Sequence, residues 1–165
     1  MALPFSNVPT AYRVESGGRF WDANCAWDSL ALVRLLGLQQ ARVVDHGGRG
    51  REGRLLSVVD GDLVERDGVI SSPRPAWQWW DDIVFTRSRI LLFRSEEAAR
   101  SWMSSAGKAL ATSMTLDQCW NISETWYSGR LDLNYQRPPL DHFQRVLGRA
   151  GLIGDAWSLS PPRAA

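Results

Sequence analysis

The stretch over residues 17–38, GGRFWDANCAWDSLALVRLLGL, constrains the fold more than any other part of the chain. Asn24 is a preferred N-cap residue, because its side-chain oxygen can accept a hydrogen bond from the first turn of a helix. Apolar residues then recur at a spacing that predicts a mostly buried helix, which Gly37 is suited to end in the left-handed conformation. The rest of the chain must therefore supply a core around this helix. Its apolar positions are Ala26, Trp27, Leu30, Ala31, Val33 and Leu35.

The first turn of this helix carries a thiol and a carboxylate. Cys25 and Asp28 are three residues apart, so they lie one above the other on one helix face. The positive end of the helix dipole favours a thiolate, whereas the nearby carboxylate opposes it and could itself hold a proton. Such a pair can attack with sulfur and then transfer a proton. The alternative is a small buried Cys25 beside an acid that only complements the dipole, and spacing alone favours this alternative because C-x-x-D is a weak pattern.

Strand-like stretches separated by turn signals follow this helix and one precedes it. Asp60-Gly61 is a strong signal for a two-residue hairpin turn. The glycine-rich run HGGRGREG could cradle a phosphate, but no helix signal follows it, so a mobile hairpin connection is favoured. Strands are expected over residues 11–15, 41–45, 54–59, 63–66, 69–71, 83–85 and 90–93.

Helix signals dominate the second half of the chain. Three helices are expected there, each with a recognisable start. They cover residues 96–103 after the N-cap Ser95, residues 116–127 from the capping-box pair Thr115 and Gln118, and residues 140–149 after Pro138-Pro139.

The grouping of these elements predicts an α+β fold, with a mixed, mostly antiparallel sheet and flanking helices. No internal repeat or linker divides the 165 residues, so we expect a single domain over residues 1–165. Residues 1–8 and 160–165 are expected to be loose ends.

The amino-acid composition limits the classes of binding partner that we expect. The formal net charge is +1, from 19 basic and 18 acidic residues, so neither a nucleic acid nor a membrane is expected as a partner.

The only two cysteines, Cys25 and Cys119, are far apart and lack metal-ligand spacing, and Cys119 is expected to be a buried structural thiol. Free thiols, together with an N-terminus that lacks signal-peptide features, favour a cytoplasmic protein.

Two segments carry a resemblance to a known family. Residues 8–32, VPTAYRVESGGRFWDANCAWDSLAL, resemble the active-site segment of the organomercurial (alkylmercury) lyases. Residues 79–102, WWDDIVFTRSRILLFRSEEAARSW, are similar to the second active-site segment of that family. The resemblance implies an organomercurial-lyase-like α+β core. In that family two cysteines hold mercury and an aspartate protonates the leaving carbon. The first cysteine falls on Cys25 and the aspartate on Asp28, but the second cysteine falls on Arg87.

Arg87 changes the expected chemistry. One thiolate and an arginine can bind mercury but activate it poorly, because cleavage of a carbon–mercury bond needs two soft ligands. An inward-facing Arg87 needs an acidic partner, which is either Asp28 or a substrate carboxylate. The resemblance and this substitution together predict a lyase-like or isomerase-like enzyme in which Cys25, Asp28 and Arg87 act on a small anionic or aromatic molecule, with specialised metabolism as one setting.

Two alternatives stay open at this point. The chain could be a true alkylmercury lyase that recruits Cys119, or a non-catalytic protein that binds a small ligand. The nine tryptophans are compatible with a pocket for a flat organic ligand, although ordinary packing explains each of them singly. Trp21, Trp27 and Trp80 are the candidate substrate contacts. We expect no cofactor and no bound metal, except mercury on Cys25 if mercury is the substrate. A homodimer and a monomer are both left open.

Overall fold

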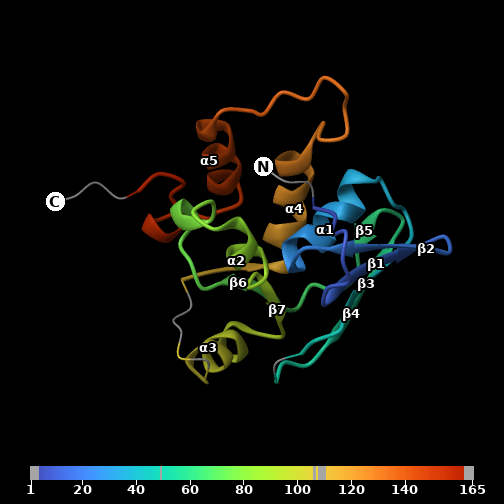
Figure 1. Cartoon of the computed structure of the whole chain (residues 1–165), viewed down its shortest axis with the longest axis horizontal. Helices are drawn as coiled ribbons and strands as arrows, with labels where there is room; N and C mark the ends of the chain where they lie inside the picture. Colours follow the sequence, from blue (N-terminus) through green and yellow to red (C-terminus); the bar gives the residue numbers. More distant parts are fainter. Residues whose placement is uncertain (1–3, 49, 106, 108–110, 162–165) are drawn as a thin grey trace.

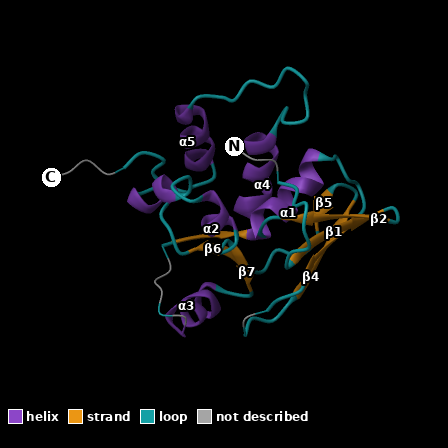
Figure 2. Cartoon of the chain, in the orientation of Figure 1, coloured by secondary structure: helices purple, strands orange, loops and turns teal. Residues whose placement is uncertain are grey.

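A computed structural model describes residues 4–48, 50–105, 107 and 111–161 (Figure 1). Eight strands form two separate antiparallel sheets, and Figure 2 shows them as two groups with helices around them. The α+β prediction is confirmed, with two antiparallel sheets in place of one mixed sheet. The first sheet has the order β2-β1-β3-β4-β5, with β1 (Tyr12–Ser16), β2 (Arg19–Ala23), β3 (Ala41–Asp45), β4 (Arg54–Val59) and β5 (Asp62–Leu63).

One face of the first sheet packs on the helix α1 (Ala26–Leu35). Val14, Val43 and Leu56 lie directly opposite one another on neighbouring strands, and each is at most 1% exposed. Alternating side chains point to opposite faces of a strand, so this row forms an apolar stripe under the helix. Gly37 follows α1 with a φ of 61°, as its position predicted.

The second sheet has the order β7-β6-β8 and contacts α3 and α4. In the view of Figure 1, α3 lies below β6 and β7 and α4 lies above them. The capping box of Thr115 and Gln118 opens α4 as predicted, and the last helix has the predicted bounds. The elements are β6 (Val69–Ser72), β7 (Leu91–Phe93), α3 (Glu96–Ser105), β8 (Thr112–Thr115), α4 (Leu116–Tyr127) and α5 (Leu140–Arg149).

Side chains from β1 and from the loop between β3 and β4 bind the backbone of β7. The hydroxyl oxygen of Tyr12 accepts a hydrogen bond from the Leu92 N–H at 3.2 Å, and the Arg51 guanidinium donates to the Leu92 carbonyl at 2.9 Å. The buried carboxylate of Asp45 holds Arg51 in place. The two sheets are therefore joined at Leu92 by polar contacts as well as by the apolar core.

Several local predictions are wrong. Residues 83–87 form a short helix, α2 (Ile83–Arg87), because the Asp82 side chain accepts a hydrogen bond from the Phe85 N–H and caps it. A strand expected over residues 63–66 ends at Leu63. β2 and β8 were not predicted, because polar residues interrupt their apolar alternation.

The expected loose ends differ in part from the structure. Phe5 bridges to Ala23, and the Ser6 N–H donates to the Asp22 carbonyl at 2.7 Å, so the lead-in is attached to β2 from its described beginning. Residues 1–3 and 162–165 lie outside the described residues. Two short turns of 3-10 helix, η1 (Ala76–Gln78) and η2 (Asp155–Trp157), complete the described chain, and Trp157 is buried.

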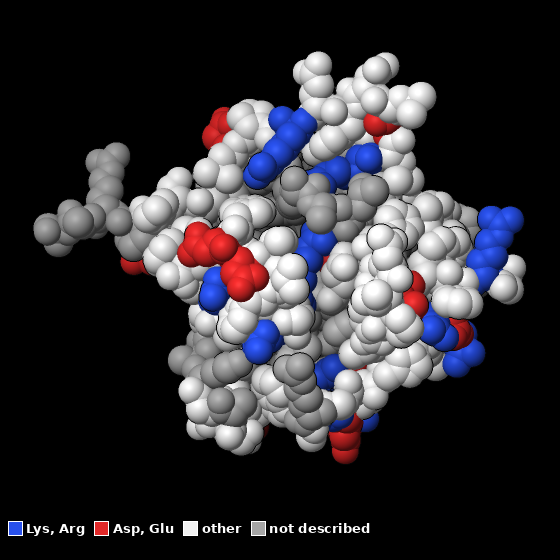
Figure 3. Space-filling model, viewed as in Figure 1, with Lys and Arg blue, Asp and Glu red and all other residues white. Residues whose placement is uncertain are grey.

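The charged side chains on the surface are of both signs, in agreement with the small net charge. Figure 3 shows Lys and Arg side chains interspersed with Asp and Glu side chains over one face of the molecule. None of the helices in the described part of the chain combines the length and apolar composition that a membrane crossing needs.

Candidate functional site

Cys25 is itself the N-cap of α1. Its backbone is extended, and its sulfur accepts a hydrogen bond from the Asp28 N–H at 3.4 Å. Asn24, the predicted N-cap, instead donates a side-chain hydrogen bond to the Phe5 carbonyl at 3.0 Å. The cap is therefore one residue later than expected, and it fixes the sulfur against the first turn that carries Asp28.

The Asp28 carboxylate lies between a tyrosine and an arginine. Its Oδ1 accepts a hydrogen bond from the Tyr127 hydroxyl at 2.5 Å, and its Oδ2 lies 3.5 Å from Arg87 Nε. The Asp28 residue is only 1% exposed. A buried carboxylate needs such partners, because an unpaired charge inside a protein is costly. Tyr127 comes from the last turn of α4, so the site depends on the packing of α1 against α4.

Arg87 faces inward, as its alignment with an active-site residue predicted, but it does so from a helix. It is the last residue of α2, and 10% of its side chain is exposed. The Ile90 N–H donates to the Arg87 carbonyl at 3.2 Å, while the Ile90 carbonyl accepts from the Ala26 N–H at 3.1 Å. These two bonds connect the end of α2 to the start of α1, which brings the guanidinium to Asp28.

Burial sets the protonation of the site. Burial raises the pKa of Asp28, although the charge of Arg87 and the hydrogen bond from Tyr127 act in the opposite direction. Burial and then the neighbouring Asp28 raise the pKa of Cys25 well above that of an ordinary thiol. The helix dipole was expected to favour a thiolate at Cys25. Complete burial outweighs that effect, so the neutral thiol is the favoured form.

Arg87 remains charged in this environment. Burial acts to lower the pKa of Arg87, but Asp28, Tyr127 and Cys25 raise it, and the net shift is upward. The site therefore combines a permanent cation, a carboxyl group that holds its proton to higher pH, and a neutral thiol. This combination can bind a small anion and give a proton to it.

Cys25, Asp28 and Arg87 line one small cavity. Its volume is about 30 Å³, which equals roughly the space of one water molecule in the liquid. Aromatic side chains make up most of the remaining wall, so the cavity has room for a small reacting group. These aromatic residues are Trp27, Trp79, Trp80, Trp126 and Tyr127.

The structure brings most of the predicted site residues together. Trp27 and Trp80 line the cavity with the three polar residues, whereas Trp21 lies on β2 opposite Val14 and is not part of the wall. Cys119 is fully buried on α4 and does not line the cavity either. The sequence analysis missed Tyr127, since its role comes from helix packing and no local motif marks it.

The two buried thiols predict a fall in stability at alkaline pH. Burial raises the pKa of both Cys25 and Cys119, so above the usual thiol pKa of about 8.5 the unfolded chain loses protons that the folded chain retains. Each thiol should then lower the free energy of unfolding by about 1.4 kcal/mol per pH unit. We expect Cys119→Ala to remove one such contribution between pH 8.5 and 10, measured by urea unfolding. Parallel pH curves for the two proteins would contradict this assignment.

Comparisons with known proteins concern the family and the fold of the chain. Residues 5–128 match the family model MerB, described as alkylmercury lyase, which confirms the resemblance seen in the sequence. The chain is also similar to a solved structure, the mercury-bound form of MerB2, with a TM-score of 0.55 and 22% identity. That alignment covers 76% of this chain and 61% of that chain, so this chain spans less than two thirds of the length of that protein. Likeness at this identity supports a shared fold. No curated protein matches the chain.

Proposed function

Because the chain belongs to the alkylmercury lyase family, we propose that it is a divergent member that acts on a small anionic or aromatic organic molecule. Cys25, Asp28 and Arg87 supply acid–base or nucleophilic chemistry of the lyase or isomerase type. One observation carries the proposal: a buried arginine shares the cavity with Asp28, and of the two cysteines only Cys25 lines that cavity. Mercury chemistry requires two cysteine sulfurs as soft ligands, and this cavity contains one.

Arg87 binds the substrate anion. Its planar guanidinium can hold a carboxylate or enolate oxygen through two parallel hydrogen bonds. Arg137 lies 6.0 Å from the ring of Trp80, which lines the cavity. The exposed acids Asp81 and Asp82 follow Trp80 directly, so the case for an anion site rests on Arg87.

Asp28 transfers the proton. In the protonating direction, the O–H bond of Asp28 breaks and the carbanion electron pair of the substrate forms a new C–H bond. The negative charge then resides on the Asp28 carboxylate, where Arg87 and the Tyr127 hydroxyl stabilise it. The reverse step removes a proton from carbon. A carboxyl group whose pKa is raised toward the working pH is suited to both directions.

Cys25 acts next to this acid. Its raised pKa favours the neutral thiol, so it can serve as a second proton donor. It can also add to a carbonyl carbon: the Asp28 carboxylate takes the thiol proton, the C–S bond forms, and the electron pair of the C=O π bond moves to the oxygen, where Arg87 stabilises the charge. Both roles use the fixed position of the sulfur at the first turn of α1.

Proton exchange at carbon tests the proposal. We expect the protein to exchange C–H hydrogen for deuterium in aromatic 2-oxo acids faster than buffer does, because Arg87 holds the carboxylate while Asp28 moves the proton. The measurement is ¹H NMR of phenylpyruvate and related acids in D₂O. The corresponding neutral amides are the control ligands, and they should exchange no faster than in buffer. Exchange that does not distinguish acids from amides would exclude the anion site.

Release of benzene from phenylmercury tests the alternative. We expect a rate no higher than that given by a free thiol, because one thiol lines the cavity. Multiple turnovers that survive Cys119→Ser would overturn the proposal. Turnover that is lost with Cys119→Ser would identify a true alkylmercury lyase that uses Cys119. An aromatic acid that binds at the Cys25 cavity without either reaction, with ¹H–¹⁵N NMR shifts on α1 and α4, would identify a non-catalytic ligand-binding protein.

A further inference from the structure

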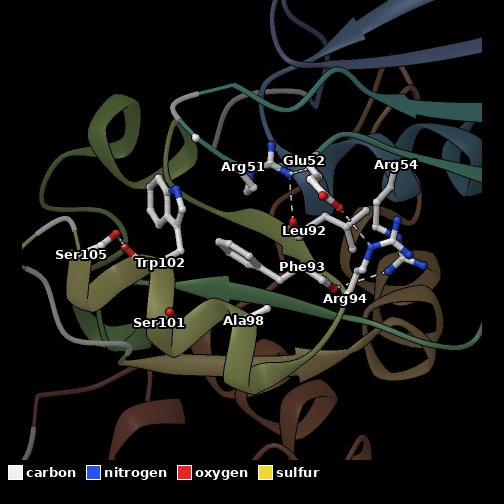
Figure 4. A pocket seen from close by; sticks show the side chains of 11 residues that line it. Arg51, Glu52, Arg54, Leu92, Phe93, Arg94, Ala98, Ser101, Trp102 and Ser105 are labelled. Carbon is white, nitrogen blue, oxygen red and sulfur yellow. Dashed lines mark hydrogen bonds and ion pairs between the residues drawn. The ribbon is translucent and has the colours of Figure 1, made fainter.

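A second and larger hollow lies between the glycine-rich loop, β7 and α3. Its volume is about 380 Å³, within the range of pockets that bind small organic molecules. Figure 4 shows the rings of Trp102 and Phe93 beside each other, between the Arg51 side and α3. The hollow shares no lining residue with the Cys25 cavity. It is therefore a separate candidate site.

The loop wall is built from the HGGRGREG run, of which residue 49 lies outside the described residues. Gly48 and Arg51 form an antiparallel bridge and exchange both backbone hydrogen bonds at 3.0 Å. The Gly47 N–H donates to the Asp45 carboxylate at 2.8 Å. These amides are occupied within the hairpin, so they do not cradle a phosphate. The loop instead places the Arg51 side chain at the hollow.

Two aromatic rings form the apolar part of the hollow. The ring centroids of Phe93 and Trp102 lie 5.8 Å apart with an interplanar angle of 52°. Phe93 is 5% exposed and belongs to the core, whereas Trp102 is only partly buried. A third flat ring placed against this pair would add aromatic contacts and would cover the exposed part of Trp102.

The charged residues that line the hollow indicate that its ligand carries a negative charge. Three arginines and one glutamate line the hollow, but Asp45 already binds Arg51 and Asp67 already binds Arg54. The remaining pair, Arg94 and Glu52, is 3.5 Å apart, with side chains 66% and 82% exposed. An exposed ion pair contributes at most about 1 kcal/mol, so Arg94 can exchange this partner for a ligand anion at little cost.

We propose that this hollow binds a flat aromatic carboxylate, with its ring against Phe93 and Trp102 and its carboxylate on Arg94. Ser101 and Ser105 on α3 line the same hollow and offer hydroxyl groups near the ligand. This site is independent of the proposed chemistry at Cys25. Binding there does not require Asp28 or Arg87.

Titration with 2-naphthoate tests the proposal, with neutral 2-naphthamide as a ligand of the same shape. We expect the carboxylate to bind about 5-fold more tightly than the amide, because one charge-assisted hydrogen bond forms at a partly solvated position. The measurement is ¹H–¹⁵N NMR of the full chain. Shifts should concentrate on α3, β7 and the Trp102 indole. Equal affinity for the two ligands, or shifts centred on α1 and α4, would overturn the proposal.

Variants test separately the charge contact at Arg94 and the space that the ligand ring occupies. Arg94→Gln should weaken 2-naphthoate about 5-fold and leave 2-naphthamide unchanged. Arg100→Gln is the matched control, because Arg100 is an exposed arginine on α3 outside the hollow. Ser101→Phe should fill the hollow and block both ligands. Full binding by Ser101→Phe, or an equal loss with Arg100→Gln, would contradict the assignment.

Discussion

Replacing Asp28 with asparagine is expected to lower the rate of carbon deuteration by about 10²- to 10⁴-fold, which is the usual contribution of one positioned proton-transfer group. Asparagine has nearly the same shape, and its carbonyl oxygen can still accept the hydrogen bond from Tyr127. It cannot carry the proton. The free energy of unfolding should also fall, because the buried Arg87 loses its carboxylate partner. The variant must therefore be assayed well below its melting temperature, with circular dichroism confirming that it is folded.

The Asp22→Asn variant is the matched control for this experiment. Asp22 pairs with Arg13 at 3.2 Å, its side chain is 12% exposed, and it lies outside the Cys25 cavity. This substitution should leave the exchange rate within about 2-fold of the wild-type rate, since no proton donor is lost at the site. Full activity in Asp28→Asn would remove Asp28 from the chemistry. Equal losses in both variants would indicate a general structural effect.

Trp27→Ala is expected to lower the free energy of unfolding by about 3–5 kcal/mol, or about 10 °C in melting temperature. Trp27 is 4% exposed, and its ring lies 4.9 Å from that of Trp126 and 5.6 Å from that of Trp79. Its Nε1 donates to the Ser123 hydroxyl at 3.1 Å, so truncation also leaves a buried hydroxyl with one partner fewer. Thermal unfolding followed by circular dichroism measures the loss.

The Trp80→Ala variant is the comparison for Trp27→Ala. Trp80 is only partly buried, although it lines the same cavity, so its removal should cost about 1 kcal/mol or less. Its effect should appear in ligand binding, where a wall of the cavity is lost. If replacing either tryptophan lowers the free energy of unfolding equally, the distinction between the buried Trp27 and the partly buried Trp80 would be wrong.

The sequence predicted the elements whose signals are local. The capping box of Thr115 and Gln118, the glycine after α1 and the pair Cys25 and Asp28 each depend on residues within one or two turns. The family resemblance added Arg87, whose inward position no local pattern requires. These features were therefore available before any tertiary structure was known.

The missing features depend on contacts between distant segments. Tyr127 reaches Asp28 from 99 residues away, because α4 packs on α1, and no spacing rule encodes that contact. The raised pKa of Cys25 likewise reflects burial, whereas the sequence shows only its place at a helix end. At α2, the apolar residues 83–85 suggested a strand. In the structure the Asp82 side chain caps this segment, which therefore forms a helix.

The contacts at Leu92 have a consequence for solubility. β7 is an edge strand of its sheet, and an unpaired edge is a template on which a strand from another molecule can add. Tyr12 and Arg51 occupy the outward-facing N–H and carbonyl of Leu92, so the hydrogen bonds that an incoming strand would need there are already made. A side chain of β1 and one of the β3–β4 loop thus protect this edge of the second sheet from edge-to-edge aggregation.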